Sequence, residues 1–174
     1  APCPDAMVLH LAESSNAEGN AAEGNAGFCI DAYESPGLER TPQTGMGLDA
    51  AAAQCAADDK RLCSAQEWEL ACRDRGVSSW PYGTRFDEEI CNVASDRAGL
   101  TGSYSRCRTS LGVYDMSGNV AEWVADGAIR GGSASDRSKG RCSQVRPNPA
   151  AQTAYSDVGF RCCADAIDSK TRSD

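Results

Sequence analysis

The sequence has a single histidine, His10, and contains no Cys-x-x-Cys pair. A three-histidine iron site and a two-histidine facial triad are both excluded, because each needs more imidazoles than the chain has. Structural zinc is disfavoured too, since His10 lies far in sequence from any cysteine cluster. His10 follows a short apolar run, so we expect an ordinary strand residue there.

Long apolar runs and positive charge are also scarce. No apolar run approaches the roughly 20 residues that a membrane-spanning helix needs. The chain has 17 Lys and Arg against 25 Asp and Glu, a formal net charge of -8, and this balance repels phosphate backbones and anionic lipids. We therefore expect no nucleic-acid partner and no membrane insertion. The acidity fits a soluble protein, or one that holds cations.

Cysteine, by contrast, is abundant. The chain of 174 residues has ten cysteines, which is many for a reducing cytosol, and an even count permits complete pairing. The length suits one domain. We therefore expect a disulfide-rich domain that is secreted, periplasmic or on the cell surface.

The patterns predict few and short elements. Asp49 is a candidate cap for a helix through the alanine-rich residues 50–58. Ser64 and Glu67 have the capping-box spacing for a second helix, which Gly76 would end. Strands are expected over 6–11, 28–34, 121–126, 128–133 and 158–165.

Two segments are expected to lie outside the packed domain. Residues 11–27 contain a repeat of Ala-Glu-Gly-Asn-Ala and have little apolar surface to bury, so they predict a mobile loop. Residues 166–174 predict a flexible C-terminal tail.

The adjacent acid pairs at 58–59 and 88–89 are of the kind that is usually solvated, so they are poor candidates for a catalytic acid and base.

The stretch GVYDMSGNVAEW (112–123) carries the most chemistry. It is not an EF-hand, because the loop glycine would fall at Val120 and the bidentate acid at Asp126. Two interpretations remain open. Asp115 and Glu122 could bind calcium together with turn carbonyls, or the stretch could be a hydrogen-bonded turn in which Asp115 caps backbone amides.

Five motifs occur in one order: CAADDKRLCSAQEWELACR, WPYG, GVYDMSGNVAEW, RGGS and GFRCCAD. Together they resemble the formylglycine-generating enzyme (sulfatase-modifying factor) family, over about Met7 to Asp165. The resemblance implies a single domain over 1–165 with an α+β, C-type-lectin-like fold. Such a domain is loop-rich, with two helices and one small twisted antiparallel sheet.

The resemblance also implies what chemistry to expect. Active members bind copper(I) through two cysteines between the GGS strand and the next Arg-Cys, and they oxidise a substrate cysteine to formylglycine; other relatives hold iron with three histidines. Here the segment between Ser133 and Arg141 reads ASDRSKG and has no cysteine. We therefore expect neither copper nor iron. The chain is interpreted as a non-catalytic binding or structural domain for an unknown protein or glycan ligand.

Two alternatives remain. The cysteine chemistry could have moved to another position, for example to Cys162 and Cys163, giving a formylglycine-generating or related oxidase. The domain could instead be a carbohydrate-binding module, a hypothesis that depends on fold analogy alone.

Structural residues follow from the same resemblance. It implies the disulfides Cys55–Cys162 and Cys72–Cys142, and each would close a long loop that restrains the unfolded chain by roughly 4 kcal/mol in the entropic model. It does not pair the other six cysteines, which are Cys3, Cys29, Cys63, Cys91, Cys107 and Cys163.

The resemblance implies calcium as a structural ion as well. The ligands carried over from the family are Asp115, Gly118, Val120 and Glu122. A second calcium site would use Asn92 and Val93, with Asp96 as a candidate for its acid.

Overall fold

The computed structural model describes residues 3–11 and 27–167 of the chain. Its elements, in chain order, are β1 (Met7–His10), β2 (Phe28–Asp31), α1 (Leu48–Ala57), β3 (Arg61–Leu62), α2 (Ala65–Cys72), β4 (Ala121–Trp123), β5 (Ile129–Arg130), β6 (Val158–Phe160) and β7 (Cys162–Asp165). Most of the expected loop at 11–27 and of the expected tail at 166–174 lies outside the described residues. Two helices and short strands agree with the expected α+β class.

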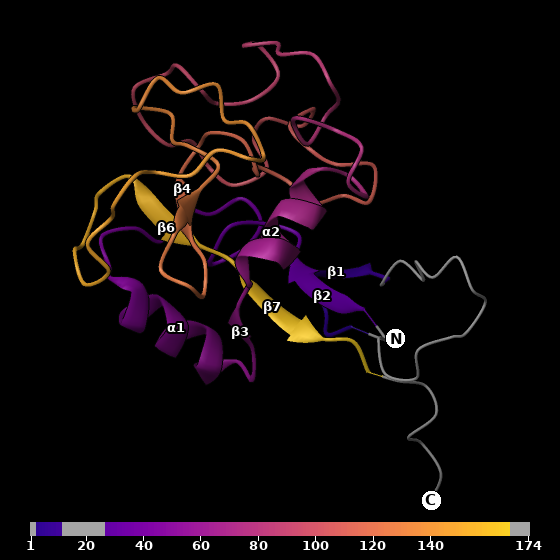
Figure 1. The fold of residues 1–174 in the computed structure, drawn as a ribbon, viewed down its shortest axis with the longest axis vertical. Coiled ribbons are helices and arrows are strands. Elements are labelled where there is room, and N and C mark those ends of the chain that lie inside the picture. Colours follow the sequence, from indigo (N-terminus) through magenta and orange to yellow (C-terminus); the bar gives the residue numbers. More distant parts are fainter. Residues whose placement is uncertain (1–2, 12–26, 168–174) are drawn as a thin grey trace, which may run out of the picture.

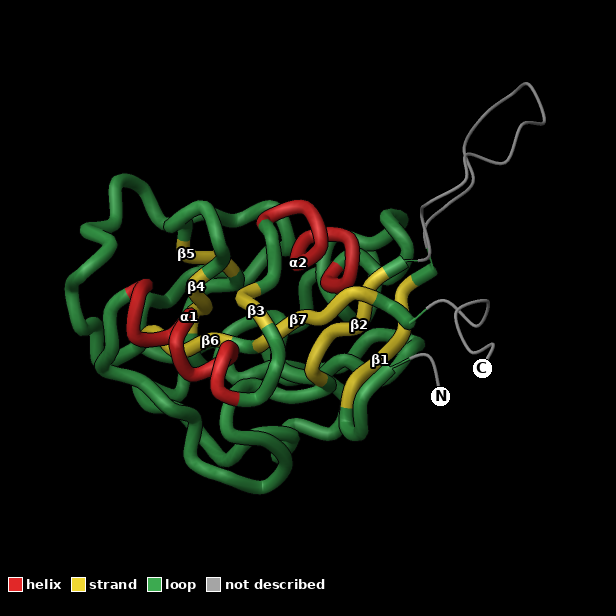
Figure 2. The backbone as a smooth tube through the Cα atoms, turned by 90° about the horizontal axis from the view of Figure 1, so that it is seen from below, coloured by secondary structure: helices red, strands yellow, loops and turns green. Residues whose placement is uncertain are grey.

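The strands form two sheets rather than the single antiparallel sheet that was expected. One sheet has the order β1-β2-β7-β3 and is antiparallel throughout. The other has the order β5-β4-β6, in which β4 and β6 run parallel. The strand predicted over 158–165 is broken at Arg161, so β6 and β7 belong to different sheets. The two sheets lie next to each other, with β1 at one end of the molecule and β5 near the other (Figure 2).

Helix α2 begins at the capping box that the sequence predicts. The Ser64 hydroxyl accepts a hydrogen bond from the Glu67 amide at 3.1 Å, and the Ser64 amide donates to the Glu67 carboxylate at 2.8 Å. Two free amides of the first turn are thereby satisfied. The helix buries Trp68 and ends at Cys72, four residues before the expected stop at Gly76.

Helix α1 begins differently from the prediction. Its N-cap is Gly47, which offers no side-chain hydrogen bond, and Asp49 lies in the first turn. A Cβ at Gly47 would come within 2.9 Å of the Gln152 backbone, so the close approach of that segment requires glycine. The carboxylate of Asp49 still suits this end of the helix, where the helix dipole is positive.

The core has three parts. One surrounds Trp68 of α2, and a second surrounds Trp123 and Phe160 beneath α1. The third is a small cluster around the Cys91–Cys107 disulfide, within the long segment between α2 and β4. That segment lies at the end of the molecule away from α1 (Figure 1). In the described part of the chain, no helix has the length and apolar character needed to cross a membrane.

Candidate functional site

Residues 112–120 form a largely buried turn that leads into β4. Asp115, Asn119 and Glu122 are all buried. Gly118 has a φ of +75°, and a Cβ there would lie 2.2 Å from the Asn92 carbonyl oxygen, so only glycine fits. The Asn119 amide donates to the same Asn92 oxygen at 2.8 Å. The two segments that the resemblance assigns to calcium therefore pack directly against each other.

The carboxylate of Glu122 is held by two donors in the core. The Arg161 guanidinium contacts it through Nη2 to Oε1 at 2.7 Å and through Nε to Oε2 at 2.8 Å. The Trp68 indole donates to Oε2 at 2.6 Å. The side chains of Arg161 and Glu122 are 0% and 1% exposed. Glu122 is thus one half of a buried ion pair.

Glu34 is a second buried acid beside this turn. One of its oxygens accepts from the Val120 amide at 3.1 Å, and the other accepts from the Asn119 side chain at 2.6 Å. Burial, and then the negative charges of Asp115 and Glu122, raise the pKa of Glu34 well above its ordinary value. Glu34 therefore fastens the turn through backbone and amide donors.

Asp115 is the third buried acid of the group. Its carboxylate accepts a hydrogen bond from the Gly102 amide at 2.6 Å. Burial raises the pKa of Asp115 to about 6, and the hydrogen bond from Gly102 and the charge of Arg161 only partly oppose this. Holding Asp115 ionised is therefore costly at this position.

These three acids face one buried guanidinium. If all three were ionised, two negative charges would have no buried partner, which a protein interior tolerates poorly. Protonation relieves this, and so would a divalent cation. Asp115 and the carbonyls of Gly118 and Val120 offer the mixed oxygen donors that calcium accepts. Glu122 fits less well, because both its oxygens already have donors.

The buried carboxylates do not by themselves make a metal site. Among residues 3–11 and 27–167, no three His, Cys, Asp or Glu side chains are arranged to hold a metal ion. A calcium ion at this turn would therefore depend on backbone carbonyl oxygens. The charge and donor type of Asp115 are compatible with calcium, whereas the Glu122 carboxylate is already held by Arg161 and Trp68.

The second proposed calcium segment is held by its own hydrogen bonds. The Asn92 side chain donates to Asn119 Oδ1 at 3.0 Å and to the Arg97 carbonyl at 3.0 Å, and it accepts from the Ser95 hydroxyl. Val93 is buried beside it. The side chain of Asp96 is 70% exposed and pairs with Arg137 at 3.0 Å.

The segment after the RGGS motif is closed by polar contacts. Ser133 is buried; its hydroxyl donates to Asp157 at 2.9 Å and accepts from the Asp136 amide at 3.2 Å. Arg146 pairs with Asp157 at 2.6 Å. Burial alone would raise the pKa of Asp157, but hydrogen bonds from Arg146 and Ser133 outweigh it and lower that pKa. Residues 134–140, to which the resemblance assigns the two thiolates, thus follow a serine held by polar contacts and contain no cysteine.

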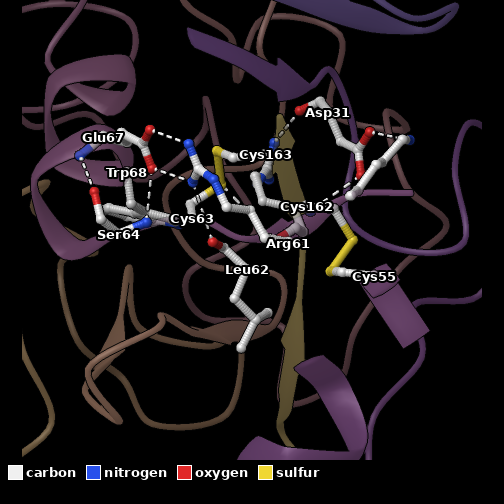
Figure 3. Close-up of a disulfide and its surroundings, with 12 residues drawn as sticks. Asp31, Cys55, Arg61, Leu62, Cys63, Ser64, Glu67, Trp68, Cys162 and Cys163 are labelled. Carbon is white, nitrogen blue, oxygen red and sulfur yellow. Dashed lines mark hydrogen bonds and ion pairs between the residues drawn. A yellow bond between two sulfur atoms is a disulfide. The ribbon is translucent and has the colours of Figure 1, made fainter. Parts of the chain in front are cut away.

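All ten cysteines lie in the described residues, and all are bonded in pairs. The five disulfides are Cys3–Cys29, Cys55–Cys162, Cys63–Cys163, Cys72–Cys142 and Cys91–Cys107. They include both pairs that the resemblance implies. The adjacent Cys162 and Cys163 bond to different partners on opposite sides of β7, because neighbouring strand residues point to opposite faces (Figure 3).

Sequence reasoning missed the buried charge network. It treated the GFRC motif only as a disulfide anchor, and it singled out neither Arg161 nor Glu34. A signal was present, because Arg161 is the one charged residue in the apolar run VGFRCC. A charged side chain within a buried strand needs a buried partner.

Comparison with known proteins places this architecture. A sequence model described as "Sulfatase-modifying factor enzyme 1-like domain" matches residues 13–166. The chain is 28% identical over 153 residues to "Inactive C-alpha-formylglycine-generating enzyme 2" of Mus musculus, covering 72% of this chain and 49% of that protein. It is 34% identical over 92 residues to "Serine/threonine-protein kinase Pkn1" of Chlamydia trachomatis serovar L2, covering 52% of this chain and 15% of the kinase.

The chain thus spans half or less of the length of these curated relatives. Among solved structures, PvdO from Pseudomonas aeruginosa superposes with a TM-score of 0.67 and 18% identity, and the match covers 91% of each chain. At that identity the likeness describes the fold.

Proposed function

The chain belongs to the sulfatase-modifying factor enzyme 1-like family, and we propose that it is a disulfide-stabilised binding or structural domain of that family without oxidase activity. The proposal combines the family's scaffold with a site that lacks the family's reactive groups. Its ligand would be a protein or a glycan. The expected location outside the reducing cytosol is part of the same proposal.

The observation that carries the proposal is the complete pairing of the cysteines. Formylglycine generation in this family, as the resemblance implies it, needs thiolates that bind copper(I). Here each of the ten cysteines is part of a disulfide, and a disulfide sulfur is not a thiolate ligand. The alternative with relocated thiols at Cys162 and Cys163 would require reduction of the bonds to Cys55 and Cys63.

The relative from Mus musculus supports this direction, because its printed name calls it inactive. Further support comes from residues 134–140, where the resemblance expects the thiolates and the sequence has no cysteine.

The test is a peptide assay run first without reductant and then with a thiol reductant, which would free Cys162 and Cys163 if their bonds to Cys55 and Cys63 are reducible. We expect no conversion of a sulfatase-type cysteine peptide to formylglycine by mass spectrometry, after incubation of the protein with copper(I) and oxygen, and no free thiol in the folded protein by thiol titration. An active formylglycine-generating enzyme serves as the positive control. If the protein converts the peptide, and if Cys162→Ser or Cys163→Ser abolishes this conversion, the relocated-thiol alternative is established instead.

We also propose that calcium binds at residues 115–122 as a structural ion. The charge balance supports this, since one divalent cation would offset the two acids that Arg161 leaves uncompensated. Asp115, Gly118 and Val120 would supply carboxylate and carbonyl oxygens, and Glu122 would share its carboxylate with Arg161. The ion would join the turn to β4 and would leave no acid free for catalysis.

The variant that tests calcium is Asp115→Asn, because a change at Glu122 would also break the pair with Arg161. We expect calcium to raise the melting temperature of the chelator-treated protein, and Asp115→Asn to remove this response. Asp96→Asn, which changes an exposed acid, should leave the response intact. If calcium does not change the melting temperature of the unmodified protein, the stretch is a hydrogen-bonded turn and nothing more.

A further inference from the structure

A hollow of about 450 Å³ lies on the surface of the loop-rich part, at the segment that follows α2 and the segment around Cys107. Five of its nine lining residues carry hydroxyl groups, among them Ser78 and Ser105, and two others are Arg106 and Arg108. The hydroxyls of Ser78 and Ser105 form no hydrogen bond with another described residue. The hollow therefore presents both cationic and neutral donors.

The charge of this hollow contrasts with that of the protein. The formal net charge of the chain is -8, and basic side chains such as Lys60 and Arg61 pair with acids. Within the described residues, neither Arg106 nor Arg108 is in an ion pair. The one acid in the lining is Asp74, which already accepts a hydrogen bond from Ser110 at 2.7 Å. Two arginines and one aspartate leave the hollow with a net positive charge of one.

The two arginines are held on a rigid support. Cys107 between them is fully buried in the disulfide with Cys91, while both arginines are exposed. The Cys107 carbonyl accepts from the Asp115 amide at 3.0 Å, and Arg108 forms a β-bridge with Tyr114. The Arg108 guanidinium lies 5.9 Å from the centre of the Tyr114 ring. A support fixed before binding lowers the entropic cost of holding a ligand.

We propose that this hollow binds the oxyanion of a small hydroxylated ligand, namely a phosphate or sulfate monoester of a sugar. Guanidinium groups match such oxyanions through parallel hydrogen bonds, and the serine hydroxyls suit the hydroxyls of a sugar. The volume is in the range of small-molecule sites. Long polyanions are a poor fit, because the chain as a whole has a formal net charge of -8 and repels them.

The test is a nuclear magnetic resonance titration of the oxidised protein with glucose 6-phosphate, glucose 6-sulfate and, as the neutral probe, glucose. We expect saturable shifts of the amides of residues 105–110 and 78 with one or both esters and none with glucose. The ester that binds more tightly identifies the anion. Arg106→Gln and Arg108→Gln should each weaken binding about fivefold or more, since each removes a charge-assisted hydrogen bond. The control Arg40→Gln, an exposed arginine without an ion pair and outside the hollow, should leave binding unchanged.

Three results would overturn the inference: no shift with either ester, equal shifts with glucose, or an affinity that neither Arg106→Gln nor Arg108→Gln changes. The inference rests on the proposed role as a binding domain, but the two fail separately. Conversion of a cysteine peptide would refute the absence of oxidase activity and leave ester binding untouched. A titration without amide shifts would refute the ester site and would not affect the conclusion from the peptide assay.

Discussion

The substitution Arg161→Met tests the buried charge network most directly. Among the described residues, Arg161 is the only guanidinium that contacts Glu122, and its other two hydrogen bonds go to the carbonyl oxygens of Asp31 at 3.1 Å and Tyr114 at 2.8 Å. Methionine fills similar volume without charge. In the part of the chain that the structure describes, the variant would leave Glu122 with the Trp68 indole as its only side-chain donor, close to two further buried acids.

The size of the effect follows from the burial of both partners. Removing one side of a buried ion pair costs about 3–5 kcal/mol, because the other charge is left uncompensated. For a chain of this size each kcal/mol lowers the melting temperature by roughly 2–4 °C, so we expect a fall of roughly 6–20 °C. Thermal unfolding should be followed without reductant and with chelator, so that no divalent cation replaces the guanidinium.

Arg137→Met is the matched control. Its ion pair with Asp96 is exposed, with side chains 75% and 70% accessible, and such pairs contribute about 0–1 kcal/mol. Adding Glu122→Gln to Arg161→Met should recover part of the loss, because it removes the charge that was left alone. If Arg161→Met melts within about 2 °C of the control, the pair does not stabilise the fold and the reasoning fails.

Two further predictions concern the neighbouring segments. In chemical unfolding, Gly118→Ala should lower the free energy of unfolding several times more than Gly112→Ala. Both glycines have a positive φ, but only Gly118 has a backbone oxygen 2.2 Å from the added Cβ. Equal losses of unfolding free energy in the two variants would contradict the close packing on Asn92. The folded pKa of Asp157 is lowered, so its contribution is present above the unfolded value of about 4 and is lost as the pH falls through the folded pKa. The stability difference between the unmodified protein and Asp157→Asn should therefore shrink between about pH 5 and pH 2, and a difference that stays constant over this range would show that the Arg146 pair adds nothing.

Local sequence signals predicted local structure well. The capping box at Ser64 and Glu67 involves atoms three residues apart, so the spacing alone contained the geometry of the start of α2. The start of α1 was placed wrongly, because Gly47 is determined by its contact with the Gln152 backbone. Local helix propensity does not reflect a contact between segments about 100 residues apart in the sequence.

The candidate site was predicted in part. The sequence singled out the turn at residues 112–123, and Asp115 and Glu122 are indeed buried in it. Their partners could not be derived from the turn itself, because Glu34, Trp68 and Arg161 come from three distant segments. The pairing of Cys55 with Cys162 came from the family resemblance. The even number of cysteines showed only that complete pairing was possible.

The break between β6 and β7 connects these observations. A continuous strand over 158–165 would place all its residues in one sheet, whereas the observed chain leaves the three-stranded sheet at Phe160 and enters the four-stranded sheet at Cys162. Arg161 lies between them, with its charge turned into the core toward Glu122 of β4. The next two residues are bonded to Cys55 of α1 and to Cys63, which directly precedes the cap of α2.

Three consecutive residues thus tie the two sheets and both helices together. Short strands of two to four residues provide few ladder hydrogen bonds, so each sheet would be weakly held by its own pairing alone. The ion pair and the two disulfides at residues 161–163 add connections between the two sheets and the helices. The lone arginine in VGFRCC is therefore explained by the architecture: it is the point where a loop-rich chain passes from one small sheet to the other, and its charge fixes the turn that leads into β4.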